Sequence, residues 1–483
     1  MELPGDNSRG SEKHLAREPR THAKEMDHVG QDAAAEAGQE PVGTLVRAGT
    51  HPMSTTPGEG VSPPVAATRG FWMLMGYAVV LGIFGAFAAL VFLGIIGRGA
   101  QWYSASDSGW FGGHWWWLAV TVAAGVVVGL LHRLMHLPEQ TPGFVADLAD
   151  EHVDTRLVPG IAVVSAVSLM GGASLGPEKA LGAIGGGAGT WLSKRRQLST
   201  DDAQVNTLAG FAGAYSGLFS SPVIIVMMIL EVARPGGNQL TKALVGSIVA
   251  ASVSFGVYFA IAGAFFVDAY QVPTYEYESW QLLVAVGLGL FAAVTVTVLV
   301  ALIQLMTKLF ARMRLPGIAK AALGGLAFGL IGVILPLTMF NGSDQLKTVI
   351  HEAGTLGAGL LTVLVIAKML TFAVSLGSGF VGGPVFPSLF IGGTAGVLVH
   401  QMIPGVPLGL AFTCLLAAVP GSLVSAPFAM VLVAAFLTQI GALQTAPILI
   451  SVVTAYLAMQ GVKFLLAKRT QAVAGSGPEG SNA

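Results

Sequence analysis

Long apolar runs begin at Phe71 and recur along the chain to about residue 466, separated by short polar segments. A helix needs about 20 predominantly apolar residues to cross the hydrocarbon core of a bilayer. Runs of that length predict membrane helices at 71–97, 115–132, 157–175, 205–230, 243–267, 281–307, 359–377 and 447–466. The alternating pattern of a membrane β-barrel is absent. We therefore predict an all-α, polytopic membrane protein.

Other apolar runs are shorter or are interrupted by glycine and proline. They lie at 180–193, 318–339, 386–402, 406–419 and 422–437. Backbone groups in lipid must be satisfied within the protein, so broken helices occur only where protein or a polar cavity surrounds them. These runs predict helices that are packed inside the molecule.

Composition divides the chain into a charged N-terminal segment and a longer apolar part. Hydrophobic residues make up 53% of the chain and charged residues only 11%, against about 25% charged residues in soluble domains. Seventeen of the 51 charged residues fall in the first 70 positions, which predicts a disordered tail over 1–69. Translation from Met53 or Met73 remains an alternative. The single cysteine, Cys414, excludes a disulfide framework, and we expect it to be a small buried side chain.

An internal repeat appears when the chain is shifted by 207 positions. The segment GPEKALGAIGGGAG at 176–189 then lies over GPVFPSLFIGGTAG at 383–396, with seven of fourteen positions identical, and Gly172 lies over Gly379. Weak repeats with Gly/Pro-interrupted hydrophobic segments at matching positions are typical of transporters, whose site lies near the midplane between the repeats. We predict membrane repeats at 70–270 and 271–466 and a disordered tail at 467–483.

The two Gly-Pro pairs predict helix starts inside the protein. Proline is favoured at the first helical position, so Pro177 and Pro384 are each expected to open a short helix. A helix N-terminus presents backbone N–H groups and a partial positive charge to an anion. Glycines later in both segments are expected to let these helices pack closely on their neighbours. Packing alone is the alternative reading of the glycines.

These residues resemble the CLC family of chloride channels and chloride/proton exchangers. The resemblance covers nearly all of 71–466 and rests on SLGP at 174–177, on SSP at 220–222 leading to LEVARP at 230–235, and on GSGFVGGPVFP at 377–387. It implies a homodimer with one anion pore in each subunit. Each subunit would be an antiparallel pair of inverted repeats built from tilted and broken helices.

The resemblance implies an anion site that departs from the family pattern. Leu175 stands where the family has its gating glutamate, and Pro384 replaces a residue whose N–H would face the anion. The inner proton-relay acid is replaced by Val232, which follows Glu231. The anion-binding candidates are Ser174, Leu175, Gly176, Pro384, Val385, Phe386, Thr141 in place of a serine hydroxyl, and Leu443, near the position of an inner-gate tyrosine.

The role of Glu178 stays open at this point. An ionisable residue within membrane segments is a functional hypothesis by default. Glu178 acts as a displaced gate, or it pairs with Lys179 or another base and anchors the helix. The structural role is the preferred reading, with Leu175 gating by dewetting. Lys368 is expected to have a structural partner.

No enzyme motif and no metal-ligand spacing is present in the sequence. We expect no cofactor, no metal ion and no nucleic-acid partner. The predicted function is transport of chloride or a similar small anion across the plasma (inner) membrane through a passive channel, because Leu175 and Val232 carry no protons. The alternative is an anion/proton antiporter that uses Glu178.

Overall fold

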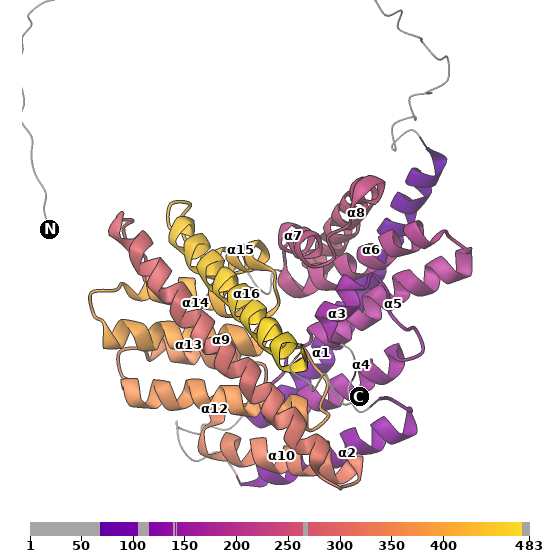
Figure 1. Ribbon diagram of the computed structural model, residues 1–483. Coiled ribbons are helices and arrows are strands. Elements are labelled where there is room, and N and C mark those ends of the chain that lie inside the picture. Colours follow the sequence, from indigo (N-terminus) through magenta and orange to yellow (C-terminus); the bar gives the residue numbers. More distant parts are fainter. Residues whose placement is uncertain (1–67, 105–114, 139–140, 142, 264–268, 476–483) are drawn as a thin grey trace, which may run out of the picture. The chain divides into compact units, whose positions relative to one another are not determined.

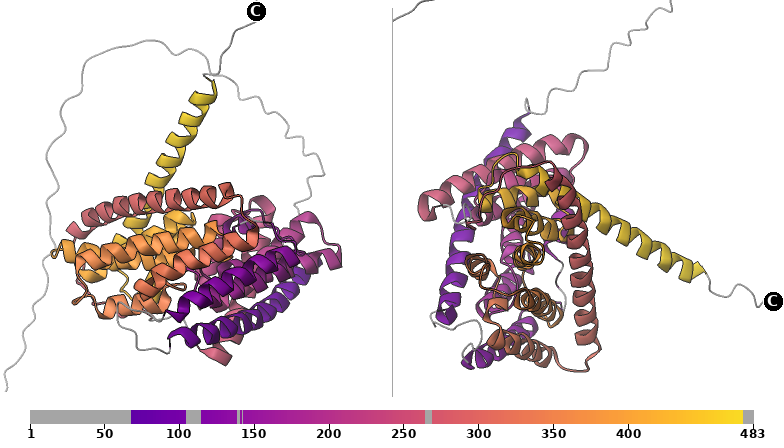
Figure 2. Two further views of the ribbon diagram at one scale, coloured as in Figure 1. Left: turned by 90° about the horizontal axis from the view of Figure 1, so that it is seen from below. Right: turned by 90° about the vertical axis from the view of Figure 1, so that its left-hand side faces the viewer.

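The computed structural model describes residues 68–104, 115–138, 141, 143–263 and 269–475. The predicted tail over 1–69 lies almost wholly outside these residues. Residues 62–483 form one compact unit. Its described part is a stack of tilted helices, with those of the first repeat and those of the second in two adjoining halves (Figures 1 and 2).

The helices follow the predicted runs in order, but they are more numerous, because the short helices at 144–149 and 343–351 were not predicted. They are α1 (Arg69–Ser104), α2 (Trp116–Leu134), α3 (Phe144–Ala149), α4 (Val158–Met170), α5 (Glu178–Arg196), α6 (Thr200–Phe219), α7 (Pro222–Val232), α8 (Gly237–Ala262), α9 (Trp280–Arg312), α10 (Gly317–Ile334), the 3₁₀ turn η2 (Pro336–Thr338), α11 (Ser343–His351), α12 (Ala358–Gly377), α13 (Val385–Met402), α14 (Leu408–Leu423), α15 (Pro427–Thr438) and α16 (Thr445–Gly475). Among the described residues, eight helices are long and apolar enough to span a membrane.

Several of the predicted runs were wrong in their extent. The run at 205–230 is two helices, because Ser220 takes a left-handed conformation (φ 49°) and Ser221 caps a new helix that begins at Pro222. The run at 157–175 ends at Met170, just before the left-handed Gly172 (φ 84°). α16 also continues past residue 466 to Gly475, as Figure 2 shows.

Glycines set the spacing of the helices next to each Gly-Pro pair. Gly185 and Gly189 lie directly on the backbone of α6, where an added Cβ would collide. Gly392 and Gly396 stand in the same relation to the backbone of α14, and each lies 207 positions after its counterpart. The predicted close packing is therefore confirmed in both repeats.

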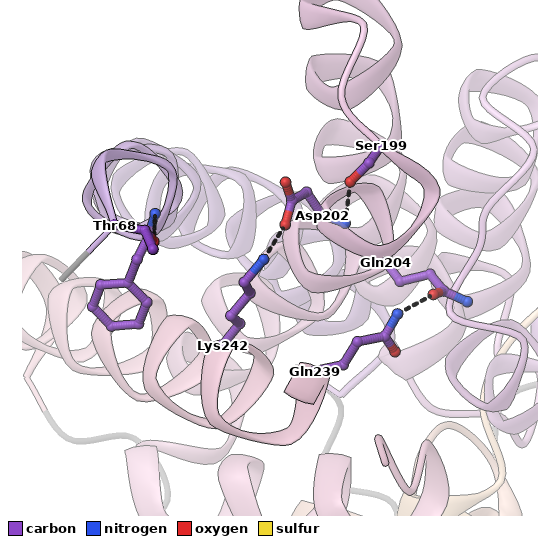
Figure 3. A network of polar contacts seen from close by, with 7 residues as sticks. Thr68, Ser199, Asp202, Gln204, Gln239 and Lys242 are labelled. Carbon is purple, nitrogen blue, oxygen red and sulfur yellow. Dashed lines mark hydrogen bonds and ion pairs between the residues drawn. The ribbon is translucent and has the colours of Figure 1, made fainter. Parts of the chain in front are cut away.

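A polar cluster joins α6 and α8 near their first turns (Figure 3). Lys242 forms an ion pair with Asp202 at 2.8 Å, and Gln239 donates to Gln204 at 3.1 Å. Ser199 caps α6 by accepting the N–H of Asp202. Side chains of this kind belong where helices leave the apolar region, so the cluster indicates that this end of α6 and α8 lies at the membrane surface.

Candidate functional site

The starts of α5 and α13 meet in the interior of the unit. Gly176 and Gly383 form an antiparallel bridge, in which the N–H of Gly176 donates to the oxygen of Gly383 at 2.8 Å and the reverse bond is 2.7 Å. These glycines precede the two helix starts. The predicted approach of the two segments is therefore confirmed.

The contacts around this bridge are those of a two-fold axis. The N–H of Ser174 donates to the hydroxyl of Ser375 at 3.3 Å, and the N–H of Val381 donates to the hydroxyl of Ser168 at 3.1 Å. Each residue and its counterpart are 207 positions apart, like Gly176 and Gly383. Four reciprocal hydrogen bonds thus join the two repeats at one junction, and all of these residues are buried.

Pro177 and Pro384 are N-caps rather than first helical residues, which corrects the predicted position of each proline by one residue. The carbonyl of Pro177 accepts the N–H of Leu181 at 3.1 Å, and that of Pro384 accepts the N–H of Ser388 at 3.2 Å. A residue that accepts the first intrahelical bond from outside the helix is by definition the N-cap. Both helices are also long, since they contain 19 and 18 residues.

Glu178, the first residue of α5, places its carboxylate on the N-terminus of α13. Its side chain is fully buried, and Oε1 accepts the N–H of Phe386 at 3.0 Å. The amides of Val385 and of Glu178 itself also face the carboxylate. Because a helix N-terminus carries a partial positive charge, this is the position in which an anion would be stabilised.

The carboxylate of Glu178 has room to lie there because its neighbours lack side chains. A Cβ added to Gly176 or to Gly383 would overlap the carboxylate. Its second oxygen, Oε2, is buried and has no hydrogen-bond partner among the described residues. Lys179 forms its ion pair with Asp147 of α3 and not with Glu178. Among the described residues, only backbone amides therefore stabilise the negative charge of Glu178.

The two-fold arrangement does not extend to the charge of Glu178. The residue 207 positions after Glu178 is Val385, which has no charge to offer to the start of α5. A single carboxylate thus serves a junction of two helix N-termini. Since the four hydrogen bonds that join the repeats are reciprocal, this single charge is the chemically distinctive feature of the site.

Aromatic side chains and a cavity surround the junction. The hydroxyl of Tyr215 donates to the backbone oxygen of Glu178 at 3.0 Å, and Phe219 stacks on Phe386 with ring centroids 6.1 Å apart. A cavity of about 630 Å³ reaches Pro177 and Phe386, the residues on either side of the carboxylate. Its wall is mainly apolar and also includes Asn341, Asp344 and Gln345, from α11 and the segment before it.

The other predicted site residues are not all brought together. Leu175 is fully buried, and a Cβ on Gly382 would collide with it, so it lies beside the junction. Thr141 is partly buried and precedes α3. Leu443 lies in the turn before α16 with 68% of its side chain exposed, and no hydrogen bond described here joins it to the junction. The described residues contain no cluster suited to a metal ion.

Sequence reasoning missed the serine pair and the tyrosine. Ser168 and Ser375 are polar residues in apolar helices, and the 207-residue shift places one over the other. That coincidence was a usable signal for a contact at the repeat axis. Tyr215 gave no such signal, because its contact with Glu178 depends on how α5 packs against α6.

Comparison with known proteins gives a family and several relatives. Residues 140–460 match the family model described as voltage gated chloride channel. Over 307 residues the chain is 27% identical to YfeO of Salmonella choleraesuis (strain SC-B67), provisionally described as an ion-transport protein, covering 62% of this chain and 72% of that one. The YfeO of Salmonella newport (strain SL254) is 26% identical over the same shares of both chains.

Solved structures share the fold at low sequence identity. A slow cyanobacterial Cl⁻/H⁺ antiporter superposes with a TM-score of 0.71 at 19% identity, covering 83% of this chain and 98% of its own. A CLC-type fluoride/proton antiporter gives 0.69 at 19% identity, covering 80% of this chain and 95% of its own. A eukaryotic CLC transporter gives 0.62 at 16% identity, covering 82% and 73%.

Proposed function

The chain belongs to the voltage gated chloride channel family, and from this premise we propose that it carries chloride or a similar small anion past the junction of α5 and α13. Members of this family are anion transporters or channels. As an integral multi-pass membrane protein, this one is proposed to act in the plasma (inner) membrane. The anion would be stabilised by helix N-termini without a lysine or arginine beside it.

One observation is the main support for an anion path at this junction. The carboxylate of Glu178 lies on the N–H of Phe386, where the partial charge of α13 favours an anion. A carboxylate and a permeating anion are both negative and compete for the same backbone donor. We therefore propose that Glu178 gates the path by occupying the anion position and by leaving it when protonated. Leu175, buried next to it, provides an apolar wall to the same constriction.

We propose that the anion moves without coupling to protons. In the exchangers that the sequence resembles, one acid gates the anion and a second, inner acid relays the proton. Here the position of the second is Val232, whose side chain holds no proton. One titratable gate is sufficient to open and close a pore, whereas a fixed exchange ratio needs a defined route for the proton to both sides.

The second candidate is an anion/proton antiporter in which Glu178 itself carries the proton. Its support is the unpartnered Oε2, which offers a buried place for a proton on the carboxylate. Two of the similar structures are of antiporters, for chloride in one case and fluoride in the other. The two candidates share the anion path and differ only in what the proton does.

The test is anion efflux from proteoliposomes that contain the full-length protein, with a chloride electrode outside and a pH dye inside. We expect chloride release above that of protein-free liposomes, with proton movement that follows the membrane potential only. A fixed proton-to-chloride ratio that drives protons uphill would establish the antiporter instead. Efflux of neither chloride nor fluoride would contradict the proposed function as a whole.

A further inference from the structure

A second cavity, lined by other residues than the one beside Glu178, lies where four helices end or begin. It has a volume of about 280 Å³ and is formed by the last turns of α2 and α9, the first turn of α10 and the turn that follows α12. Figure 1 shows α2 and α10 side by side, with α9 running down to the start of α10. Its size is near the lower end of ligand pockets, roughly 300 Å³, so it suits a small group.

The charged side chains on its mainly apolar wall are basic. His132, Arg133 and Lys320 line the cavity, and none of its described lining residues is acidic. Arg312 and Arg314, both exposed, belong to the chain segment between α9 and α10, and the sequence from 305 to 321 contains no Asp or Glu. A group that enters this cavity therefore meets positive charge on several sides.

Backbone geometry adds to the same preference. α10 begins at Gly317 after the N-cap Pro316, and both residues line the cavity. The positive end of this helix dipole thus lies at the cavity, and Lys320, one turn further on, is also one of its lining residues. Arginine binds phosphate oxygens in a two-pronged geometry, and lysine binds them as a point charge. The combination fits a phosphate group.

The surroundings of the cavity distinguish a lipid from a free ion. Leu134 follows Arg133 and is 63% exposed, and Leu305 and Leu309 on the last turns of α9 are 55% and 45% exposed. Apolar side chains of this size are covered by acyl chains in a membrane. A basic cavity bordered by lipid-facing leucines matches a molecule with a charged head and an apolar tail.

We propose that this cavity binds the phosphate-bearing headgroup of an anionic phospholipid, held by Arg133 and Lys320 at the N-terminus of α10. His132 has a second task, because its Nε2 lies 2.9 Å from the oxygen of Gly379 and so ties α2 to the turn after α12. The bound lipid would stabilise the end of the molecule where α2, α9 and α10 meet. This proposal does not depend on how the anion path works.

The experiment measures lipid binding to the full-length protein by native mass spectrometry and by thermal unfolding. Phosphatidylglycerol and phosphatidylcholine are compared, and the double variant Arg133→Gln/Lys320→Gln is set against Lys194→Gln/Arg195→Gln, which removes the same charge from the exposed last turn of α5. We expect phosphatidylglycerol to bind the unmodified protein and the control alike, and the cavity variant about a hundredfold more weakly, since each of the two charged hydrogen bonds is worth about tenfold or more.

Three outcomes would overturn the proposal. Equal loss of binding in both double variants would mean a diffuse surface charge, and equal binding in all proteins would mean another site. If inorganic phosphate protects the unmodified protein from unfolding as well as phosphatidylglycerol does, the site is for a free anion. Thermal unfolding in phosphatidylcholine alone shows whether each variant is folded. If the double variant is misfolded, the single variants Arg133→Gln and Lys320→Gln are measured in its place.

Discussion

The contacts of Glu178 differ from those that its sequence position suggested. Its sequence position next to Lys179 suggested an ion pair and an anchoring role, but the lysine pairs with Asp147 and the carboxylate crosses to the other repeat. The sequence placed Glu178 correctly on the first turn of α5. It did not contain the distance between that turn and α13, which is set by the packing of Gly176 and Gly383.

Replacing Glu178 with Gln is expected to raise anion efflux at neutral pH by about tenfold or more, because the neutral amide no longer competes as a charge for the N–H of Phe386. In the unmodified protein efflux should rise as pH falls, since protonation of the carboxyl removes its charge. The variant should lose this pH dependence. Efflux from proteoliposomes between pH 5 and 8 measures both effects.

The matched control is Glu352→Gln, at the C-terminal end of α11. It should behave like the unmodified protein at every pH. An unchanged pH dependence in Glu178→Gln would show that another group gates the path. A loss of thermal stability without any change in efflux would return Glu178 to the anchoring role.

Lys368 is a buried cation held by backbone oxygens. Its Nζ donates to the carbonyls of Thr338, Met339 and Phe340 at 3.1, 3.1 and 2.8 Å, and it lies 5.0 Å from the centre of the Phe390 ring. The expected structural partner is thus the η2 segment, whose oxygens the ammonium satisfies, together with an aromatic face on α13.

Replacing Lys368 with Met should destabilise the protein by about 2–4 kcal/mol, because it leaves buried carbonyls without a donor. Lys347→Met on the exposed side of α11 is the control and should have little effect. Thermal unfolding in detergent compares the two. Equal midpoints would show that water replaces the ammonium at no cost.

At the scale of elements, hydrophobic runs located the helices and failed at their breaks. The run at 205–230 reads as one span because Ser220 and Ser221 are small, and only the following proline marks the interruption. A left-handed residue followed by a capping serine is a backbone event that hydropathy does not record. The repeat was more informative, since it located both helix starts to within one residue.

Glu231 connects elements of the two repeats in the manner of a helix cap. From the end of α7 its carboxylate accepts the N–H groups of Phe428 and Ala429, at 2.7 and 2.8 Å, in the first turn of α15. These amides have no partner within their own helix. The side chain thus fastens α15 to α7 through charge-assisted hydrogen bonds.

Replacing Glu231 with Ala should cost about 1–2 kcal/mol, as the loss of a cap does. The first turn of α15 should then exchange its amide hydrogens faster, while that of α13 stays protected. Hydrogen exchange followed by mass spectrometry measures both segments, and Glu276→Ala in the exposed loop before α9 is the control. Unchanged exchange at 427–430 would contradict the capping role.

At the scale of the whole molecule we propose a homodimer, with an apolar interface separate from the two pores. The proposal follows from the family to which the chain belongs. Large apolar side chains are exposed on many helices, among them Val223 on α7 and Phe428 on α15, and lipid or a second subunit covers such faces equally well. Stepwise photobleaching of labelled protein in bilayers should give two subunits per particle. Monomers at high protein density would contradict it.

The lone carboxylate at an otherwise two-fold junction gives the pore a built-in polarity. The two repeats are related by the axis between Gly176 and Gly383. Glu178 therefore approaches the proposed path from one half only, because its counterpart in the other half, Val385, is uncharged. Exchanging them, with Glu178→Val and Val385→Glu, would place the carboxylate against the amide of Lys179, the counterpart of that of Phe386. Because the charge would then approach the proposed path from the opposite half, we expect the unmodified protein and the exchanged variant to pass current preferentially at opposite signs of the membrane voltage, which recordings in planar bilayers measure.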